Sequence, residues 1–534
     1  MRNFYTFIYL LGTLSCLLLM PACSNSNDDI EDEPEQEEPI ETTTEDEKLN
    51  KIVYDFLSSY YLWNDEYKAQ TLDYTKEYQQ FFRDGLMSLK SNTLDRRAYT
   101  YTDDNGIERT SYTLFSYISE IPDYTTSTRA TNDLYKKEKE MSFGLIGLLP
   151  YAYKEDTTPN GKNYFVRFMV RGVYPGSPAD QAGLARGHFI EKLDGKDIRV
   201  NNYLELFYEL MAPTTAASHT IQTCYLQSDR TESTPTTKTI SCSPLELNPI
   251  IKAQVETVSN HKVGYLFYNQ FDGGYDEELL AELKKFKQEG ITDLVLDLRY
   301  NLGGHVVSAN LLATCIAGTA SKGKSFAEYR YNDTRMKALG NKRHVELFGE
   351  KLSNDALKSQ LADAQLNLKS LYVIVSDETA SASELVINSL EGIDLDVFLI
   401  GTTTRGKNVG MEVITVGKGE SKGNDLEKSY EIAPITFQTY NAKGFGDYEK
   451  GFVPNMEVDE TNAFNLKNAF TVYRPLGSQE EYLYGFALEQ ITGESIVKRP
   501  TASTRGTDTP TMQQLAPLAP PVRSERGMIT RWEE

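Results

Sequence analysis

The sequence predicts a multidomain chain of mixed α+β and α/β type, with a helical N-terminal domain, a β-rich middle domain and an α/β C-terminal domain. The chain has 534 residues, which is too many for one ordinary domain. Apolar residues recur at helical spacing early in the chain, and short apolar runs broken by Gly, Pro and Asn follow. From about residue 250 to 475, predicted strands alternate with predicted helices, as in a sheet covered by helices.

Residues 1–22 are typical of a secretory leader. Arg2 supplies a positive charge, and the apolar stretch from Phe4 to Met20 is short for a membrane span but fits the core of a signal peptide. Ala22 followed by Cys23 resembles a bacterial lipobox, which makes Cys23 the lipidated first residue of the mature chain. The alternative is a plain cleaved signal with an incidental cysteine.

Residues 23–46 are predicted to form an acidic linker. The stretch 28–47 holds a dozen Asp or Glu and no Lys or Arg, within a chain of net charge −22. This balance argues against nucleic acid as a partner, because phosphate binding needs a basic face. A lipid plus a flexible spacer would hold the folded part near a membrane. Acidic residues just after the lipidated cysteine resemble surface-export signals of some Gram-negative lipoproteins, so we expect an exported cell-envelope lipoprotein of the outer membrane, exposed at the surface.

Residues 47–133 are predicted to form a helical domain, because Ile52, Phe56, Tyr60 and Leu62 recur at near-helical spacing. Residues 139–246 are predicted to form the β-rich domain. Within it, Cys224 and Cys242 lie in two strand-like runs and either face each other as a disulfide or remain semi-buried thiols.

Residues 250–493 are predicted to form the α/β domain. Asp276 is predicted to cap a helix that runs through Gln288 and ends at Gly290, and a capping box formed by Ser478 and Glu481 begins another helix that ends at Gly493. The predicted strands are 263–268, 294–298, 371–375 and 397–400, with helices at 306–316 and 382–390. Residues 494–534 are rich in Thr, Pro, Ala and Ser and are predicted to be disordered.

The segment Thr379-Ala380-Ser381-Ala382-Ser383-Glu384 follows a buried strand and opens a helix. Active groups gather at the carboxyl ends of strands in open α/β sheets, and the N–H groups of the helix start can stabilise an oxyanion. Taken alone, Ser381 with Glu384 is better explained as a helix capping box than as a catalytic site.

Two other segments favour a chemical role for Ser381. Gly303 and Gly304 end the strand of Asp297 and allow the backbone to approach a ligand. Lys407 follows the strand after the Ser381 helix, so neighbouring parallel strands would bring it close to Ser381. To act as a base, this lysine must have its pKa lowered by burial.

A long constellation precedes these segments and is more specific than they are. It runs Val173-Tyr174-Pro175-Gly176-Ser177-Pro178-Ala179, then Ala182-Gly183-Leu184, then Gly187-His188-Phe189-Ile190 through Gly195. It looks like a PDZ domain of the bacterial protease type, with His188 where an Asp is common. The segment 379–384, the Gly303-Gly304 turn, Lys407 and the run Lys450-Gly451-Phe452-Val453-Pro454-Asn455 resemble the C-terminal processing peptidases, also called tail-specific proteases.

This resemblance covers roughly residues 140–475 and implies a serine peptidase core of the ClpP/crotonase-like type. It implies Ser381 as nucleophile, Lys407 as general base, and an oxyanion hole formed by the N–H of Ala382 and one from Gly303 or Gly304. The PDZ-like domain would capture polypeptide C-terminal tails by strand addition, with the carboxylate held at Ser142-Phe143-Gly144-Leu145. A Ser–Lys pair needs no cofactor, and the five His show no metal-ligand spacing.

One position departs from the resemblance. The family often carries a Gln four residues beyond the lysine, and Met411 stands there. Thr402, Thr403, Thr404 and Asn408 are candidates for the missing polar group. Two rival hypotheses remain: a catalytically silent, PDZ-containing peptide-binding lipoprotein, and an acyl-thioester enzyme on a related core. The oligomeric state and the natural substrate stay open.

Overall fold

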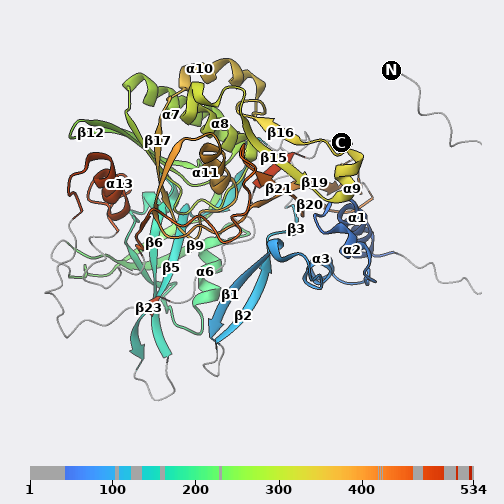
Figure 1. Ribbon diagram of the computed structural model, residues 1–534. Coiled ribbons are helices and arrows are strands. Elements are labelled where there is room, and N and C mark those ends of the chain that lie inside the picture. The colour runs from blue at the N-terminus through green and yellow to red at the C-terminus, as the bar shows by residue number, and fades with distance from the viewer. Residues whose placement is uncertain are drawn as a thin grey trace, which may run out of the picture. The chain divides into compact units, whose positions relative to one another are not determined.

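The computed structural model describes residues 43–102, 108–121, 135–156, 163–227, 231–418, 420, 422–423, 425–460, 473–497, 513–514 and 528–531. The described residues from 44 onward belong to one compact unit (Figure 1). The predicted leader and Cys23, with nearly all of the acidic linker, lie outside the described residues. Among the described helices, each is too short or too polar to cross a bilayer.

The N-terminal region begins with helices and continues as strands. Its elements are α1 (Glu45–Tyr60), α2 (Asn64–Lys68), α3 (Tyr78–Met87), the 3-10 turn η1 (Thr93–Asp95), β1 (Arg96–Thr102), β2 (Glu108–Leu114) and β3 (Tyr117–Glu120). The prediction of a helical domain is therefore wrong for the second half of this region, where β1 and β2 form an antiparallel hairpin. The run of Thr and Tyr in those strands has high β-propensity, which outweighs the helical spacing seen before it.

The middle domain is a set of short strands with two helices. Its elements are β4 (Lys139–Ser142), β5 (Leu145–Asp156), β6 (Asn163–Val173), α5 (Pro178–Gln181), β7 (Phe189–Leu193), β8 (Lys196–Asp197), α6 (Tyr203–Met211), β9 (Ser218–Cys224), β10 (Thr236–Ser241) and β11 (Ser243–Glu246). The main sheet has the order β10-β9-β7-β6-β5. Cys224 and Cys242 are free buried thiols, because the register of β9 and β10 puts them at opposite ends of the hairpin.

The C-terminal domain is built on a mostly parallel sheet with the order β12-β13-β14-β17-β18-β22. Its strands are β12 (Ile250–Val258), β13 (His261–Tyr268), β14 (Asp293–Asp297), β17 (Ser370–Val375), β18 (Asp396–Gly401) and β22 (Met456–Glu457). Its helices and 3-10 turns are η2 (Gly273–Tyr275), α7 (Asp276–Glu289), α8 (Val306–Ala317), η3 (Gly318–Ser321), η4 (Asp355–Gln360), α10 (Leu361–Ala364), α11 (Ala382–Gly392) and α13 (Tyr482–Thr492).

The two faces of this sheet are buried against different helices. Leu294 and Leu296 pack with the apolar side chains of α7, α8 and α11, whereas Val295, between them, packs with those of α13. Successive side chains of a strand point to opposite faces, so a strand buried on both faces reads as a continuous apolar run. Figure 1 shows α7, α8 and α10 gathered together and α13 apart from them.

A second sheet joins the N-terminal region to the C-terminal domain. Its order is β16-β15-β21-β19-β20-β3, where β15 is Ser325–Tyr331, β16 His344–Leu347, β19 Val409–Gly417, β20 Ser429–Ala433 and β21 Ile435–Tyr440. The short helix α9 (Asp333–Ala338) lies between β15 and β16 in the chain. Because β3 pairs with β20, the N-terminal region completes this sheet, and its helices share one apolar cluster with Val409, Met411 and Ile432.

The predicted C-terminal ends of α7 and α13 are confirmed. Gly290 takes the left-handed conformation after α7, and Gly493 does the same after α13.

The prediction that Asp276 caps α7 is wrong, because Tyr275 is the N-cap and Asp276 is the first helical residue. The start of α13 differs from the prediction, because Glu481 rather than Ser478 is its N-cap. The Glu481 carboxylate also accepts hydrogen bonds from Arg299, which holds it at the sheet.

The tail predicted to be disordered contains two short strands among its few described residues. β23 (Gln513–Gln514) pairs antiparallel with β5, and β24 (Met528–Arg531) pairs parallel with β19. Apart from these strands and residues 494–497, the tail lies outside the described residues.

A buried ionic cluster lies at the end of β14. The Arg299 guanidinium is fully buried and binds Asp297 (2.7 Å), Glu481 (2.7 Å) and Glu460 (2.9 Å). Arg186 of the middle domain joins the cluster at Glu460 (2.8 Å). Burial by itself raises the pKa of Glu460, but the charges of Arg186 and Arg299 outweigh it and lower that pKa to about 2 from 4.5.

Stability should therefore depend on pH through Glu460. A carboxyl whose pKa is lower in the folded state adds stability above its unfolded value, near 4.5, and loses it as the pH falls towards 2. We expect Glu460→Gln to have a lower Tm than wild type at neutral pH, with a difference that shrinks between about pH 5 and pH 2. The control is Glu282→Gln, which removes an exposed pair with Lys285 and should change Tm little at any pH. A difference in Tm that is constant with pH would contradict the expectation.

Candidate active site

Three turns meet where β14, β17 and β18 end. Ala380 donates its N–H to the Asn301 carbonyl (3.1 Å), which ties the turn after β17 to the turn after β14. Arg405 donates its N–H to the Thr379 carbonyl (3.0 Å), which ties the turn after β18 to the same place. These strands are neighbours and parallel, so their carboxyl ends share one edge of the sheet.

Ser381 lies at the start of α11 in a strained conformation. Its φ of 62° and ψ of −111° are rare for a residue with a side chain, and such strain costs on the order of 1–3 kcal/mol and is concentrated at functional sites. The side chain is buried. The N–H of Ser381 is donated to Glu384 (2.9 Å), which is one half of the capping box expected from the sequence.

The Glu384 carboxylate joins the Ser381 turn to the Lys407 turn. It is completely buried and accepts hydrogen bonds from the N–H groups of Gly406 (2.7 Å) and Lys407 (2.8 Å) as well as from Ser381. The Thr404 hydroxyl donates a further bond of 2.5 Å. Burial raises the pKa of Glu384, and these four donors act in the opposite direction because they stabilise the ionised form.

Lys407 is buried, with 2% of its surface exposed. Its Nζ lies 4.5 Å from the centre of the Phe115 ring, which belongs to the N-terminal region. The loop 450–455 packs against the lysine turn, since the N–H of Thr404 is donated to the Phe452 carbonyl (3.1 Å). A Cβ on Gly406 would lie 2.3 Å from the Glu449 carbonyl oxygen, so only glycine fits at that position.

The Gly303-Gly304 turn lies directly against Ser381. A Cβ on Gly303 would lie 2.9 Å from Cβ of Ser381, and one on Gly304 would lie 2.0 Å from the Phe271 carbonyl oxygen. Both residues have positive φ values, 105° and 137°. The N–H of Gly303 is donated to the Asn301 side chain (2.9 Å), which leaves Gly304 as the better oxyanion donor of the two.

The structure does not put a polar group at the position of the family Gln. Met411 is fully buried and packs in the apolar cluster shared with the N-terminal helices. Of the candidate replacements, Thr404 is bonded to Glu384, and Asn408 donates its side-chain amide to the Gly446 carbonyl (2.7 Å).

The expected carboxylate loop of the middle domain lies between β4 and β5. The N–H of Gly144 is donated to the Ser142 hydroxyl (2.9 Å), while the Gly144 carbonyl accepts the N–H of Tyr174 (2.8 Å). Phe143 is buried in the domain core and Leu145 begins β5. A ligand carboxylate would therefore use the N–H groups of Phe143 and Leu145, or displace the Ser142 hydroxyl from Gly144.

Side chains of the middle domain contact both turns of the site. Arg171 pairs with Glu378, three residues before Ser381, at 2.6 Å. Arg186 donates to the hydroxyl of Tyr300, three residues before Gly303, at 2.8 Å. The sequence pattern gave no signal for either contact, because each joins residues that are more than 100 positions apart.

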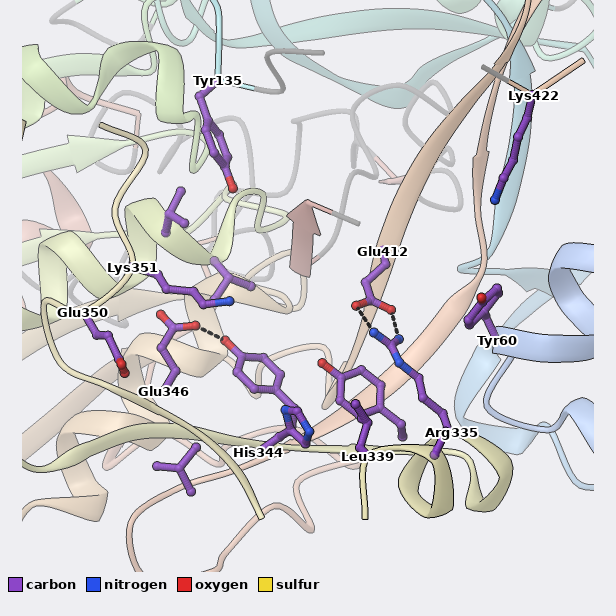
Figure 2. Close-up of a pocket in the computed structure, with 16 residues that line it drawn as sticks. Tyr60, Tyr135, Arg335, Leu339, His344, Glu346, Glu350, Lys351, Glu412 and Lys422 are labelled. Atoms are coloured by element: carbon purple, nitrogen blue, oxygen red, sulfur yellow. Dashed lines mark hydrogen bonds and ion pairs between the residues drawn. The ribbon is translucent and has the colours of Figure 1, made fainter. Parts of the chain in front are cut away.

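Two pockets lie near these turns. The larger, of about 740 Å³, is lined by Val306 and Val307, two and three residues after Gly304, but by no residue of the three turns themselves (Figure 2). Figure 2 shows one bonded pair of its lining, Arg335 with Glu412. The Tyr329 hydroxyl donates to Glu346 at 2.7 Å. Its full lining is Tyr60, Tyr135, Val306, Val307, Tyr329, Tyr331, Arg335, Ala338, Leu339, His344, Val345, Glu346, Glu350, Lys351, Glu412 and Lys422.

The smaller pocket, of about 400 Å³, separates the N-terminal region from the Lys407 turn. Phe115 and Arg97 line one side, and Thr404, Arg405 and Gly406 line the other. One wall of the space beside Lys407 therefore comes from the N-terminal region.

Two side-chain clusters of the middle domain have donor atoms close enough for a metal ion. In the cluster of Glu191, Cys224 and Glu232, Arg167 pairs with both carboxylates, at 3.3 and 2.8 Å. In the cluster of Asp194, Glu209 and His219, the His219 ring is bonded to Asp194 at 2.7 Å. Each cluster is thus already bonded to a protein side chain, and neither cluster includes a residue of the three turns.

The chain matches three described families. Peptidase family S41 matches residues 262–458, a PDZ domain matches residues 169–213, and the Peptidase S41 N-terminal domain matches residues 48–117. The second of these matches falls within the middle domain, and the third covers the helices and strands from α1 to the start of β3.

Individual proteins agree with these matches. The chain is 25% identical, over 60% of its length, to 66% of a carboxyl-terminal-processing protease of Picosynechococcus. It is 26% identical, over 55% of its length, to 50% of a CtpA-like serine protease of Staphylococcus aureus. The matched part of this chain thus spans about half to two thirds of the length of these relatives. The fold also matches a crystal structure from Bacteroides fragilis that is described as an S41 protease. The match covers 83% of this chain and 97% of the Bacteroides chain, with 26% sequence identity and a TM-score of 0.60.

Removal of the Glu384 carboxylate should loosen both turns at once. Glu384→Ala leaves four buried donors without their acceptor, which should lower the free energy of unfolding by roughly 3 kcal/mol or more. We expect faster hydrogen–deuterium exchange in the segments 376–384 and 402–410 together, measured by mass spectrometry. A matched control is Glu489→Ala, which removes another carboxylate that accepts two backbone N–H groups, those of Ile496 and Val497. Faster exchange in only one of the two segments would argue against a shared anchor.

Proposed function

We propose that this chain, which belongs to peptidase family S41 and carries a PDZ domain, is a serine-type endopeptidase that hydrolyses exported polypeptides with a Ser381–Lys407 dyad. The observation that carries the proposal is the Glu384 carboxylate, which binds the backbone N–H groups of both residues. The Gly303 contact with Ser381 supports the oxyanion part of the proposal.

The proposed reaction is acyl transfer to the Ser381 hydroxyl. Neutral Lys407 takes the proton from Ser381 as its oxygen bonds to the peptide carbonyl carbon. The tetrahedral oxyanion accepts hydrogen bonds from the N–H groups of Ala382 and Gly304, each worth roughly 3–4 kcal/mol of barrier. The Lys407 ammonium then returns the proton to the leaving nitrogen as the C–N bond breaks.

The second half of the reaction repeats these roles with water. Water attacks the ester carbon while Lys407 accepts its proton, and the Ser381 oxygen leaves with that proton. The burial of Lys407 supports its role as a base, because a low-polarity surrounding disfavours the ammonium form.

The proposed substrates are polypeptides with a free C-terminal tail. Among the described strands, β5 is paired on its outer side only by β23, at Tyr151 and Ala152. An extended chain can therefore add as a strand beside the first residues of β5, with its carboxylate at residues 142–145.

The pocket of about 740 Å³ includes Val306 and Val307, close in sequence to Gly304. Its Tyr329 and Tyr331 rings could receive a substrate side chain among charged neighbours such as Glu350 and Lys351.

The proposed location is the cell envelope, with Cys23 lipidated after removal of residues 1–22. The leader pattern and the acidic stretch 28–47 support this location. Incorporation of a labelled fatty acid by wild type but not by Cys23→Ala tests it, and equal labelling of the two proteins would contradict it.

The dyad is tested by Ser381→Ala and Lys407→Met. Each variant should lose at least about 10³-fold in kcat/KM on an unfolded polypeptide, because nucleophile and base act as a unit. The control is Ser389→Ala, which removes a buried serine hydroxyl of the same helix and should retain activity. Wild type that binds tails but hydrolyses none would favour the silent peptide-binding lipoprotein instead. Hydrolysis of an acyl-thioester in preference to the polypeptide would instead favour the hypothesis of an acyl-thioester enzyme.

Tail capture is tested on Ser381→Ala with two peptides that end in the same apolar residue. We expect the peptide with a free carboxylate to bind at least about tenfold more tightly than its C-terminal amide, because a charged hydrogen bond to backbone N–H groups is lost. Isothermal titration calorimetry measures the ratio. Equal affinities would exclude residues 142–145 as a carboxylate site.

A further inference from the structure

The N-terminal region covers the amine of Lys407. The Phe115 ring lies 4.5 Å from Nζ, and Phe115 itself is 9% exposed. Phe115 also lines the pocket of about 400 Å³ between the N-terminal region and the lysine turn. An ammonium over the face of an aromatic ring is stabilised by the ring quadrupole. The position of Phe115 therefore affects the charge of this amine directly.

A fully buried carboxylate, Asp95, holds Phe115 in place. The Phe115 N–H is donated to the Asp95 carbonyl (2.9 Å), and the next residue, Ser116, donates its N–H and its hydroxyl to the Asp95 carboxylate, both at 2.7 Å. The Tyr61 hydroxyl donates a third bond to this carboxylate, also of 2.7 Å. All three partners donate, so the carboxylate is satisfied in its ionised form.

Asp95 and Lys407 also interact electrostatically. Burial raises the pKa of the Asp95 carboxyl, the bonds from Ser116 and Tyr61 oppose this effect, and the charge of Lys407 opposes it further. An interaction between two charges acts on both, so ionised Asp95 favours the ammonium form of Lys407. The low polarity of the buried site makes such an interaction stronger than it would be at the surface.

Asp95, Tyr61 and Ser116 form a hydrogen-bond network, here called the Asp95 network. This network is bonded to the strand that pairs with Met411. The Ser116 hydroxyl accepts the N–H of Ile435 (2.9 Å), and Leu62 donates its N–H to the Ile435 carbonyl (2.9 Å). Ile435 in turn pairs with Met411 in the second sheet. The network thus adjoins the position at which the family often carries its Gln.

We propose that Asp95 is a positioning residue for Lys407, acting by its charge and through Phe115, so that the N-terminal domain completes the active site that Met411 leaves without an amide. This inference rests on the proposed function of Ser381 and Lys407. The charged and titratable groups packed around the lysine turn come from every neighbouring element: Asp95, Tyr61, Arg96 and Arg97 from the N-terminal domain, Glu384 from α11, Asp377 from the turn after β17, and Arg405, Tyr448 and Glu449 from the adjoining loops.

The test is the pH dependence of kcat/KM for Asp95→Asn. Asparagine keeps the shape and removes the negative charge, so the pKa of Lys407 falls and the acidic limb of the profile moves to lower pH. We expect a shift of at least about half a pH unit, which raises activity relative to the plateau about threefold on that limb. The matched control is Glu489→Gln, which neutralises another buried carboxylate, one that accepts the N–H groups of Ile496 and Val497, and should leave the limb unmoved.

A second variant keeps the test decisive if Asp95→Asn folds poorly. Phe115→Leu keeps an apolar cover over the amine but removes the ring quadrupole, so the acidic limb should again move to lower pH. Asp95→Asn or Phe115→Leu with reduced activity and an unmoved limb would overturn the proposal, because a purely structural role lowers the plateau alone.

A measurement without turnover separates this inference from the proposed function. In protein with ¹³Cε-labelled lysine, the NMR titration of Lys407, assigned by its absence from Lys407→Met, should move to lower pH in Asp95→Asn. If that titration moves and no variant hydrolyses polypeptide, the inference stands and the proposed function fails. If polypeptide is hydrolysed and the titration does not move, the inference fails and the proposed function stands.

Discussion

The Glu384 carboxylate is the constraint on which the rest of the site depends. It lies in a region without solvent and accepts four hydrogen bonds, three of them from the backbone N–H groups of Ser381, Gly406 and Lys407. A buried charge is tolerated only while its partners remain in place, so movement of either turn would leave unsatisfied polar groups. One side chain therefore sets the relation between two segments that are 26 residues apart. The strained φ of Ser381 persists because these bonds determine its backbone position.

A second layer of buried charge supports this arrangement from the end of β14. Arg299 is surrounded by the carboxylates of Asp297, Glu460 and Glu481, and the Tyr300 hydroxyl donates to Glu460. Arg186 brings the PDZ domain into the same cluster. Because a buried ion pair stabilises a fold only when each member is fully paired, the cluster requires all its contributing segments to be in register. The Gly303-Gly304 turn begins three residues after Tyr300, so the position of the PDZ domain is connected with that of this turn.

The sequence was most informative where a local pattern carries its own physical meaning. The family and the fold class are confirmed, and the ends of α7 and α13 lie at the glycines that local rules select. Predictions from local sequence patterns were wrong where residues distant in the chain determine where a helix begins or whether a segment forms a strand. The start of α13 lies at Glu481 because Arg299 and Arg186 hold its carboxylate. The N-terminal region turns from helix to strand, and its strand β3 pairs with β20, which is over 300 residues away.

The sequence by itself determined the order of the motifs, the turns that need glycine, and the residue types able to act as nucleophile, base and oxyanion donor. These features depend on backbone dihedral angles and on near neighbours, which a short stretch of sequence specifies. Only the tertiary structure decided that Glu384 joins the two turns, that the N–H of Gly303 is already bonded to Asn301, and that Phe115 and Asp95 lie against Lys407. Such contacts join segments far apart in the chain, and they arise from the packing of whole domains, which no local pattern of residues encodes.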